Sequence, residues 1–255
     1  MNVSLYDKTF DGLLTAIFDA YSLKCFPDVL LGEGEPLPLF TQHSFTVVTS
    51  SKKADRVWKA LEKKWSDPGC RMVRAVWLSG IENADMLLFR YMCKTLDRQE
   101  SIETDFADPL VTDLIKLAGS VSREAEYVRQ FVRFRKTRDG YYYAPVAPKY
   151  NVLPLTVAYF RSRFGDQLWV VFDTLRRYGY HYDLKEVAMF TFEEEIPGVF
   201  SGILQPEQMD NEEEMYQDFW RSYLKSLTIK ARLNPKLQRQ HMPVRFWKHL
   251  TEKQG

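Results

Sequence analysis

The spacing of apolar side chains changes along the chain near Phe131. Before this position the spacing is mainly helical, and it predicts amphipathic helices over Phe10–Tyr21 and Lys52–Trp65 with further helical pieces up to Gln130. Short strands are predicted only near Val3–Tyr6 and Phe45–Thr49. The first half of the chain is therefore expected to be mainly α-helical.

From Phe131 onward, apolar residues fall at alternate positions, which is typical of strands that bury one face. A helix over Val152–Phe164 is expected to cross between the second and third strands. A long helix is predicted from Asp210 to Asn234, followed by a short one around Phe246–Leu250. The five predicted strands are Phe131–Thr137, Tyr141–Val146, Leu168–Asp173, Tyr178–Asp183 and Val187–Phe192.

These elements predict an α+β fold, in which N-terminal and C-terminal helices surround an antiparallel β meander of about five strands and its crossing helix. A chain of 255 residues is long enough for a substantial core. We expect a single α+β domain over residues 1–255. It would be mainly helical over 1–130, β-rich over 131–196 and helical again over 209–255.

Charge is separated along the chain, although the net charge is only +1. Between Asp183 and Asp218 most of the charged side chains are acidic. Between Arg221 and Gly255, in contrast, Glu252 is the single acid. The whole protein therefore exerts little long-range attraction on nucleic acid or on an acidic membrane. A site for a polyanion has to be local.

The cysteines and the apolar segments indicate a cytoplasmic protein with no membrane contact. Cys25, Cys70 and Cys93 are odd in number and show no CxxC spacing, which favours reduced thiols. No apolar stretch approaches the ~20 residues that a membrane span requires. The N-terminal residues also lack the basic and apolar regions of a signal peptide.

A hairpin around Asp139-Gly140 is the first candidate for a functional surface, because this dipeptide favours a two-residue turn. Such a turn would bury Phe134 and Tyr143 on one face of the hairpin. Arg133, Arg135 and Tyr142 would share the other face, where guanidinium groups bind phosphates and a tyrosine stacks on a base. The alternative is an ordinary solvated sheet face. A loop longer or shorter by one residue would exchange the two faces.

The C-terminal stretch from Ile229 to Leu250 is the second candidate. It places Lys236 and Arg239 near a proline-bounded turn, among further lysines and arginines. Cations that neutralise phosphates release counterions, so binding here would depend steeply on salt. The alternative is a cationic surface that pairs with the acidic stretch before it.

Signals for catalysis are sparse. The sequence contains no phosphate-binding glycine loop and no nucleophile elbow, and its histidines are scattered, so we expect no cofactor and no metal site. Asp173 at a strand end and His181 in the following hairpin are the best candidates for general acid and base groups. The alternative is that both side chains cap turns or pair at a rim.

Four separated motifs extend over nearly the whole chain. They are YDKTFDGLLTAIFDAY (6–21), FVRFRKTRDGYYYAPVAPKYNVLPL (131–155), LWVVFDTLRRYGYHYD (168–183) and IKARLNPKLQRQHMPVRFWKHL (229–250). Together they resemble a bacterial family of DNA metabolism proteins. Members of that family are typically encoded beside a radical-SAM protein assigned to DNA modification or repair, and related domains occur fused to a module similar to uracil-DNA glycosylase. That module is absent here. The resemblance implies a role in DNA repair or modification and supplies no catalytic residues.

Three hypotheses follow. The first is an accessory protein that binds DNA or RNA through Arg133, Arg135, Tyr142, Lys236 and Arg239 and acts with a radical-SAM partner. The second is an enzyme that acts on a nucleobase or a phosphodiester, with Asp173 and His181 as acid and base. The third is a protein-interaction module that uses the acidic stretch Glu193–Glu214 and the basic stretch Lys225–Lys248.

Overall fold

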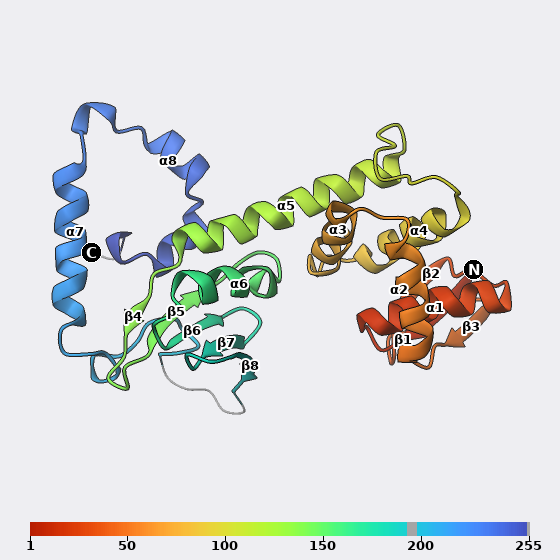
Figure 1. Ribbon diagram of the computed structural model, residues 1–255, viewed down its shortest axis with the longest axis horizontal. Coiled ribbons are helices and arrows are strands. Elements are labelled where there is room, and N and C mark those ends of the chain that lie inside the picture. The colour runs from red at the N-terminus through yellow and green to blue at the C-terminus, as the bar shows by residue number, and fades with distance from the viewer. Residues whose placement is uncertain (193–197, 254–255) are drawn as a thin grey trace. The chain divides into compact units, whose positions relative to one another are not determined.

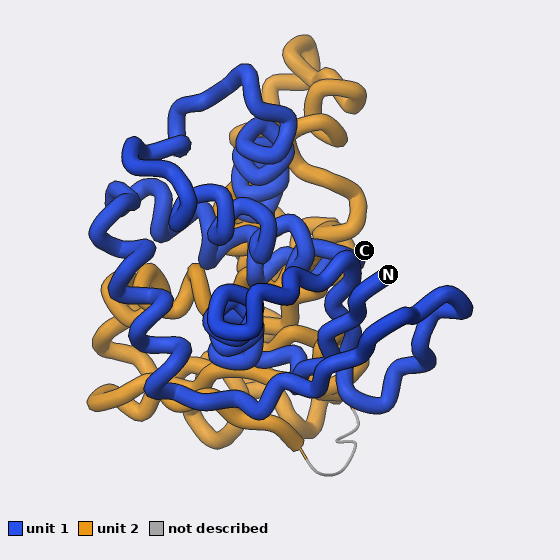
Figure 2. The backbone as a smooth tube through the Cα atoms, turned by 90° about the vertical axis from the view of Figure 1, so that its right-hand side faces the viewer, with its two compact units in different colours: residues 1–121 blue, residues 122–255 orange. Residues whose placement is uncertain are grey.

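The structure is a computed structural model that describes residues 1–192 and 198–253. It divides into two compact units, Met1–Val121 and Ser122–Gly255, which Figure 2 shows in separate colours. Glu193, Glu194 and Glu195 of the predicted acidic stretch lie outside the described residues. Whether residues 1–255 fold as one cooperative domain stays a prediction.

The first unit contains a small parallel sheet of three strands in the order β2-β1-β3. Strand β1 pairs with both neighbours, Val3 lying opposite Val29 on one side and Ser44 on the other. The strand at Val29 was not predicted, because only the residues after it carry a clear loop signal. The sheet comprises β1 (Asn2–Tyr6), β2 (Val29–Gly32) and β3 (His43–Thr46).

Five helices begin in this unit and supply most of its core. The N-cap of α1 is Thr9, whose side chain accepts a hydrogen bond from the Gly12 backbone. Leu13, Ile17, Leu61 and Val73 are fully buried, as the helical spacing of apolar residues predicts. The helices are α1 (Phe10–Leu23), α2 (Ser51–Glu62), α3 (Asp67–Trp77), α4 (Ala84–Asp97) and α5 (Pro109–Phe131), the last of which continues into the second unit.

The second unit contains a mixed sheet of five strands in the order β4-β5-β6-β7-β8, so the predicted α+β class is confirmed. Three of its pairs are antiparallel. The pair β5–β6 is parallel, because α6 (Leu153–Arg163) crosses between the two strands (Figure 1). The strands are β4 (Arg135–Lys136), β5 (Tyr142–Val146), β6 (Trp169–Asp173), β7 (Tyr178–Tyr182) and β8 (Val187–Thr191).

Each face of this sheet has its own layer of aromatic side chains. On one face Phe160 of α6 packs edge-on against Trp169, which in turn lies against Tyr182. On the other face Tyr143 and Phe172 form a buried cluster with Leu204. The sheet is therefore covered on both sides, and its side chains are core wherever these layers reach.

The C-terminal region departs from the predicted single long helix. Helix α7 (Glu213–Leu227) ends well before Asn234, where Thr228 takes an extended backbone conformation. Thr228 and Ile229 are both β-branched, which lowers helix propensity at this point. The remaining elements are the 3-10 helices η1 (Pro206–Gln208), η2 (Lys230–Arg232), η3 (Val244–His249) and η4 (Thr251–Lys253), and the short helix α8 (Pro235–His241).

Candidate nucleic-acid interface

The hairpin between β4 and β5 has a three-residue loop, so the predicted two-residue turn is wrong. The Thr137 amide donates to the Tyr141 carbonyl at 2.8 Å, and the Gly140 amide donates to the Thr137 carbonyl at 3.0 Å. Gly140 has a φ of 81°, which suits the third position of such a loop. The Thr137 hydroxyl also donates to Tyr141, at 3.0 Å, and stabilises this closure.

The longer loop moves the register by one residue and exchanges the faces of the hairpin. Arg135 pairs with Tyr143, and Lys136 pairs with Tyr142. Arg135 therefore shares a face with the buried cluster of Tyr143 and Phe172, and only 4% of it is exposed. Burial lowers the pKa of its guanidinium, while the nearby Glu213 carboxylate opposes this shift. The predicted outward position of Arg135 is wrong.

Arg133 precedes the sheet and is held in an ion pair with Glu252. Its Nε and one terminal nitrogen donate to the two carboxylate oxygens at 3.2 and 2.6 Å. The guanidinium also lies over the Trp220 ring, 5.7 Å from its centroid, and Trp220 donates to the same carboxylate at 3.2 Å. Burial raises the pKa of Glu252. Hydrogen bonding and the Arg133 charge lower the pKa by more than burial raises it, so the net shift is downward. The positive charge of Arg133 is thus neutralised within the molecule.

Arg133 and Tyr142, two of the predicted binding residues, lie at one pocket of about 820 Å³ between β4 and α7, which we call the α7 pocket. Four of its lining side chains are aromatic, and the other seven are polar or charged. Arg135 does not line it. The lining residues are Gln130, Arg133, Phe134, Lys136, Tyr142, Glu212, Glu213, Tyr216, Gln217, Trp220 and Thr251.

The first turn of α7 is fastened to strand β4, which fixes one wall of the α7 pocket. The buried carboxylate of Glu213 accepts hydrogen bonds from the Lys136 amide and from the Gln217 side chain, both at 2.9 Å. Lys136 also binds Asp210, through an ion pair of 3.1 Å and a backbone hydrogen bond. Figure 1 shows α7 beside this edge of the sheet.

Lys236 and Arg239 lie on α8, within a long exposed stretch. Every residue from 225 to 241 is exposed. In the part of the chain that the structure describes, no ion pair involves the five cations between 225 and 239, which we call the basic segment. Its cations are Lys225, Lys230, Arg232, Lys236 and Arg239.

The roles of Trp220 and Tyr216 were missed at the sequence level. The signal was present in the apolar residues that recur every three or four positions over 215–227. This periodicity predicts an amphipathic helix with one apolar face. In the structure the stripe on α7 is largely exposed, and Phe219 exposes 61% of its surface.

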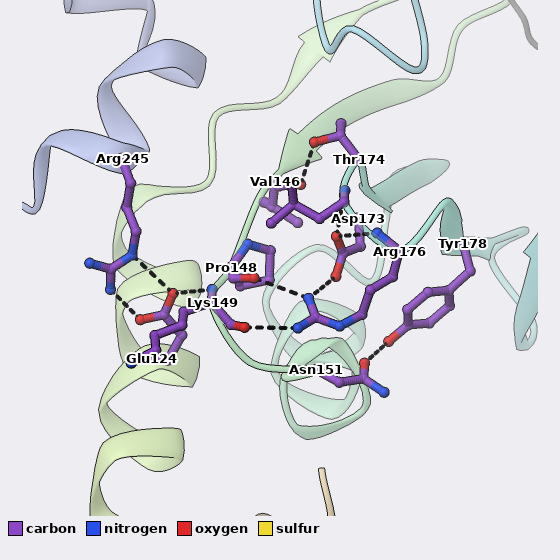
Figure 3. Close-up of polar contacts among 11 residues, drawn as sticks. Glu124, Val146, Pro148, Lys149, Asn151, Asp173, Thr174, Arg176, Tyr178 and Arg245 are labelled. Atoms are coloured by element: carbon purple, nitrogen blue, oxygen red, sulfur yellow. Dashed lines mark hydrogen bonds and ion pairs between the residues drawn. The ribbon is translucent and has the colours of Figure 1, made fainter. Parts of the chain in front are cut away.

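Asp173 is fully buried and has the contacts of a turn-capping carboxylate. It accepts hydrogen bonds from the backbone amides of Leu175 and Arg176, and from the Arg176 guanidinium at 2.9 Å. The same guanidinium donates to the carbonyls of Pro148 and Lys149 (Figure 3). Asp173 thus ties the β6–β7 turn to the loop after β5.

His181 lies elsewhere, at a second pocket of about 610 Å³ whose walls include Tyr143, Val170 and Phe190. Asp173 does not line this pocket. The strand register places His181 opposite Val170 and Asp173 opposite Tyr178, three positions further along β6. The structure therefore does not bring the predicted acid and base into one site.

A second network of polar contacts beside Asp173 links distant segments of the unit. Glu124 accepts hydrogen bonds from the Lys149 amide at 2.7 Å and from the Arg245 guanidinium (Figure 3). Tyr178 donates to Asn151 in the same region. These contacts hold the loop between β5 and α6 in place.

No helix among the described residues is both long and apolar enough to cross a membrane. Within the same residues, no group of three or more histidine, cysteine, aspartate or glutamate side chains could hold a metal ion.

A family model for a domain of unknown function, DUF4130, matches residues 82–252, about two thirds of the chain. The chain belongs to this family. The DUF4130 region includes the α7 pocket, the basic segment and Glu252. No curated protein and no solved structure matches the chain.

Proposed function

We propose that this member of the DUF4130 family is a nucleic-acid-binding accessory protein of DNA metabolism, and that its basic segment contacts the phosphates. One observation carries the proposal. The five cations of the basic segment are all exposed, and no carboxylate side chain occurs anywhere between Phe219 and Thr251. Such a segment attracts a polyanion locally, although the net charge of the chain is only +1.

The proposal moves the contact surface away from the hairpin. Arg135 is buried and Arg133 is paired with Glu252, so neither guanidinium is placed to bind phosphate. Lys236 and Arg239 remain from the sequence-based prediction. They are joined by the other three cations of the basic segment. Contacts of this kind provide affinity without reading sequence.

Binding to a protein partner is the second candidate function, and the exposed apolar side chains of α7 favour it. Phe219, Tyr223 and Leu227 are each more than half exposed. Exposed apolar patches of this kind often mark interaction sites. The resemblance to the DNA metabolism family suggests the radical-SAM protein as the partner. Both functions are compatible, because the cations Lys225 and Arg221 lie on the opposite side of α7 from this stripe.

Fluorescence anisotropy with labelled 20-nucleotide single strands and the matching duplex tests the proposal. The variant Lys230→Gln/Lys236→Gln/Arg239→Gln removes three charges from the basic segment. The matched control, Lys52→Gln/Lys59→Gln/Lys63→Gln, removes three exposed charges from and just after α2 in the first unit. We expect binding at low salt that weakens at least about tenfold in the first variant and changes little in the control.

Two results would contradict the proposal. One is the absence of binding by the wild-type chain at low salt. The other is an equal loss of affinity in both triple variants, which would show that only total charge matters. The second candidate would be favoured if the wild-type chain pulled down the radical-SAM protein from its host in the absence of nucleic acid, and if replacement of Phe219 abolished this recovery.

A further inference from the structure

Four aromatic side chains line the α7 pocket, as suits a site for a flat aromatic ligand. Tyr142 and Phe134 come from the hairpin side of the pocket, and Tyr216 and Trp220 come from α7. Tyr216 is 56% exposed. Trp220 is 37% exposed, with the Arg133 guanidinium over its ring and the Tyr223 ring stacked against it at a centroid distance of 5.9 Å. Aromatic faces in an open pocket provide stacking surfaces for a planar ring.

The Trp220 ring is held in a fixed position before any ligand arrives. Its indole nitrogen donates to Glu252, and the Arg133 guanidinium lies over its face. Glu252 in turn accepts two hydrogen bonds from the Arg133 guanidinium. Because these contacts restrain the indole, a ligand that stacks beside it loses less conformational freedom on binding.

Polar groups at the rim suit the edge of a nucleobase. Gln130 is exposed, and its side-chain amide makes no hydrogen bond within the described residues, so it offers both donors and an acceptor. The Glu212 carboxylate adds an acceptor, and its contact with the Tyr216 hydroxyl is weak, at 3.5 Å. A nucleobase combines an aromatic face with an edge of donors and acceptors.

The basic segment begins on the helix that carries two of the pocket's aromatic rings. Trp220 lies on the same helix as Lys225, which is about 7.5 Å further along the helix axis. A single strand whose phosphates contact the basic segment can therefore reach the pocket with a neighbouring base. In a duplex the bases are stacked and paired, and a base has to leave the stack before it can enter such a pocket.

From this arrangement we infer that the α7 pocket accepts one unstacked nucleobase of a single-stranded nucleic acid. The inference rests on the proposed function, since the basic segment supplies the phosphate contacts. Tyr216 and Trp220 stack on the base, and Gln130 and Glu212 meet its polar edge. Arg133 acts as a positioning residue for Trp220 and makes no phosphate contact.

Two strands of equal charge test the inference. One is a labelled 12-nucleotide oligothymidylate, and the other is a strand of the same length built from abasic nucleotides. Tyr216→Ala removes a stacking ring whose side chain has one hydrogen bond within the described residues, the weak one to Glu212, so the fold is expected to persist. Phe219→Ala is the matched control, because Phe219 is an exposed aromatic residue on the same helix that does not line the pocket. Tyr216→Phe keeps the ring.

We expect the wild-type chain to prefer the thymidylate strand by at least about fivefold, the range of one stacked base. Tyr216→Ala should lose most of this preference and keep its affinity for the abasic strand. Phe219→Ala and Tyr216→Phe should retain the preference. A stronger affinity for single strands than for duplex is expected in the same assay.

The possible failures are distinct. Equal binding of both strands by the wild-type chain would overturn the inference and leave the proposed function intact. A preference that Tyr216→Ala and Phe219→Ala reduce equally would also overturn it, since stacking would then occur along the exposed helix. Binding of neither strand would overturn the proposed function and the inference together.

Discussion

Arg133 donates to both carboxylate oxygens of Glu252, although the two residues are 119 positions apart in the sequence. The pair fastens the C-terminal 3-10 helix η4 to the segment that follows α5. It is also partly shielded, with 22% of the Arg133 side chain and 11% of the Glu252 side chain exposed. This explains why an arginine expected at a phosphate site has a structural role.

Replacing Arg133 should therefore reduce stability more than it reduces phosphate binding. Arg133→Ala leaves the mostly buried Glu252 carboxylate without its main partner, which costs about 1–3 kcal/mol. Urea denaturation measures the change in the free energy of unfolding. Arg138→Ala, in the exposed hairpin loop, should stay within about 0.5 kcal/mol of the wild type. The assignment would be contradicted if Arg133→Ala weakened binding to an abasic strand as much as the triple variant of the basic segment does.

Arg135 should be the more sensitive of the two arginines. Its guanidinium is buried near the Glu213 carboxylate, and Arg135→Ala leaves that carboxylate in a poorly solvated site. Loss of a positive charge near a buried carboxylate is expected to cost up to about 3–5 kcal/mol. Arg135→Lys keeps the charge but not the shape of the guanidinium, and should recover only part of the loss. A stability equal to that of the wild type for Arg135→Ala would show that the side chain is not core.

His249 should make the protein less stable in mild acid. Burial lowers the pKa of its imidazole to about 4, and the charges of Lys248 and Arg135 add to this effect. Between about pH 6.5 and pH 4 the unfolded chain binds a proton at this site and the folded chain does not. The contribution of neutral His249 to the free energy of unfolding is therefore fully present above pH 6.5. It is lost as the pH falls toward 4, by about 3 kcal/mol in total.

The variant His249→Leu separates this effect from the titration of carboxylates. Its free energy of unfolding, measured by urea at several pH values, should decline less than that of the wild type between pH 6.5 and pH 4. His241→Gln, at an exposed position on α8, should follow the wild-type curve. Parallel curves for His249→Leu and the wild type would contradict the assignment to His249.

Asp173 should prove to be a stability residue. Asp173→Asn keeps the size of the side chain and removes the charge that faces Arg176, so about 2 kcal/mol of stability should be lost. Nucleic-acid affinity per folded molecule should not change. Thermal denaturation and anisotropy together provide the two readouts. A normal melting temperature combined with loss of a catalytic activity would instead support the acid–base hypothesis.

Much of the second unit could be predicted from its apolar periodicity. The strands from Tyr141 to Phe192 and the crossing helix after Val152 follow patterns that local sequence encodes directly. The parallel pairing of β5 and β6 is less direct, since it depends on the path of α6 across the sheet. In the first unit the strand at Val29 was missed, because a run of four residues is too short to show a period.

The candidate site could be predicted only in part, because it depends on register and on distant partners. The dipeptide Asp139-Gly140 favours two turn types, and the contacts of Thr137 with Tyr141 select the longer one. The one additional residue in the loop decides the side of the hairpin on which Arg135 lies. The partner of Arg133 is near the C-terminus, and no local pattern indicates it. Lys236 and Arg239 were easier to place, since exposure follows from the charge of their own segment.

The salt dependence of binding tests the role of the basic segment most directly. For a single strand, the slope of log affinity against log salt changes by about 0.7 for each phosphate contact. Removing Lys230, Lys236 and Arg239 should therefore make the slope shallower by about 2. The control that removes Lys52, Lys59 and Lys63 should leave the wild-type slope in place. Identical slopes for the wild type and both variants would contradict the account.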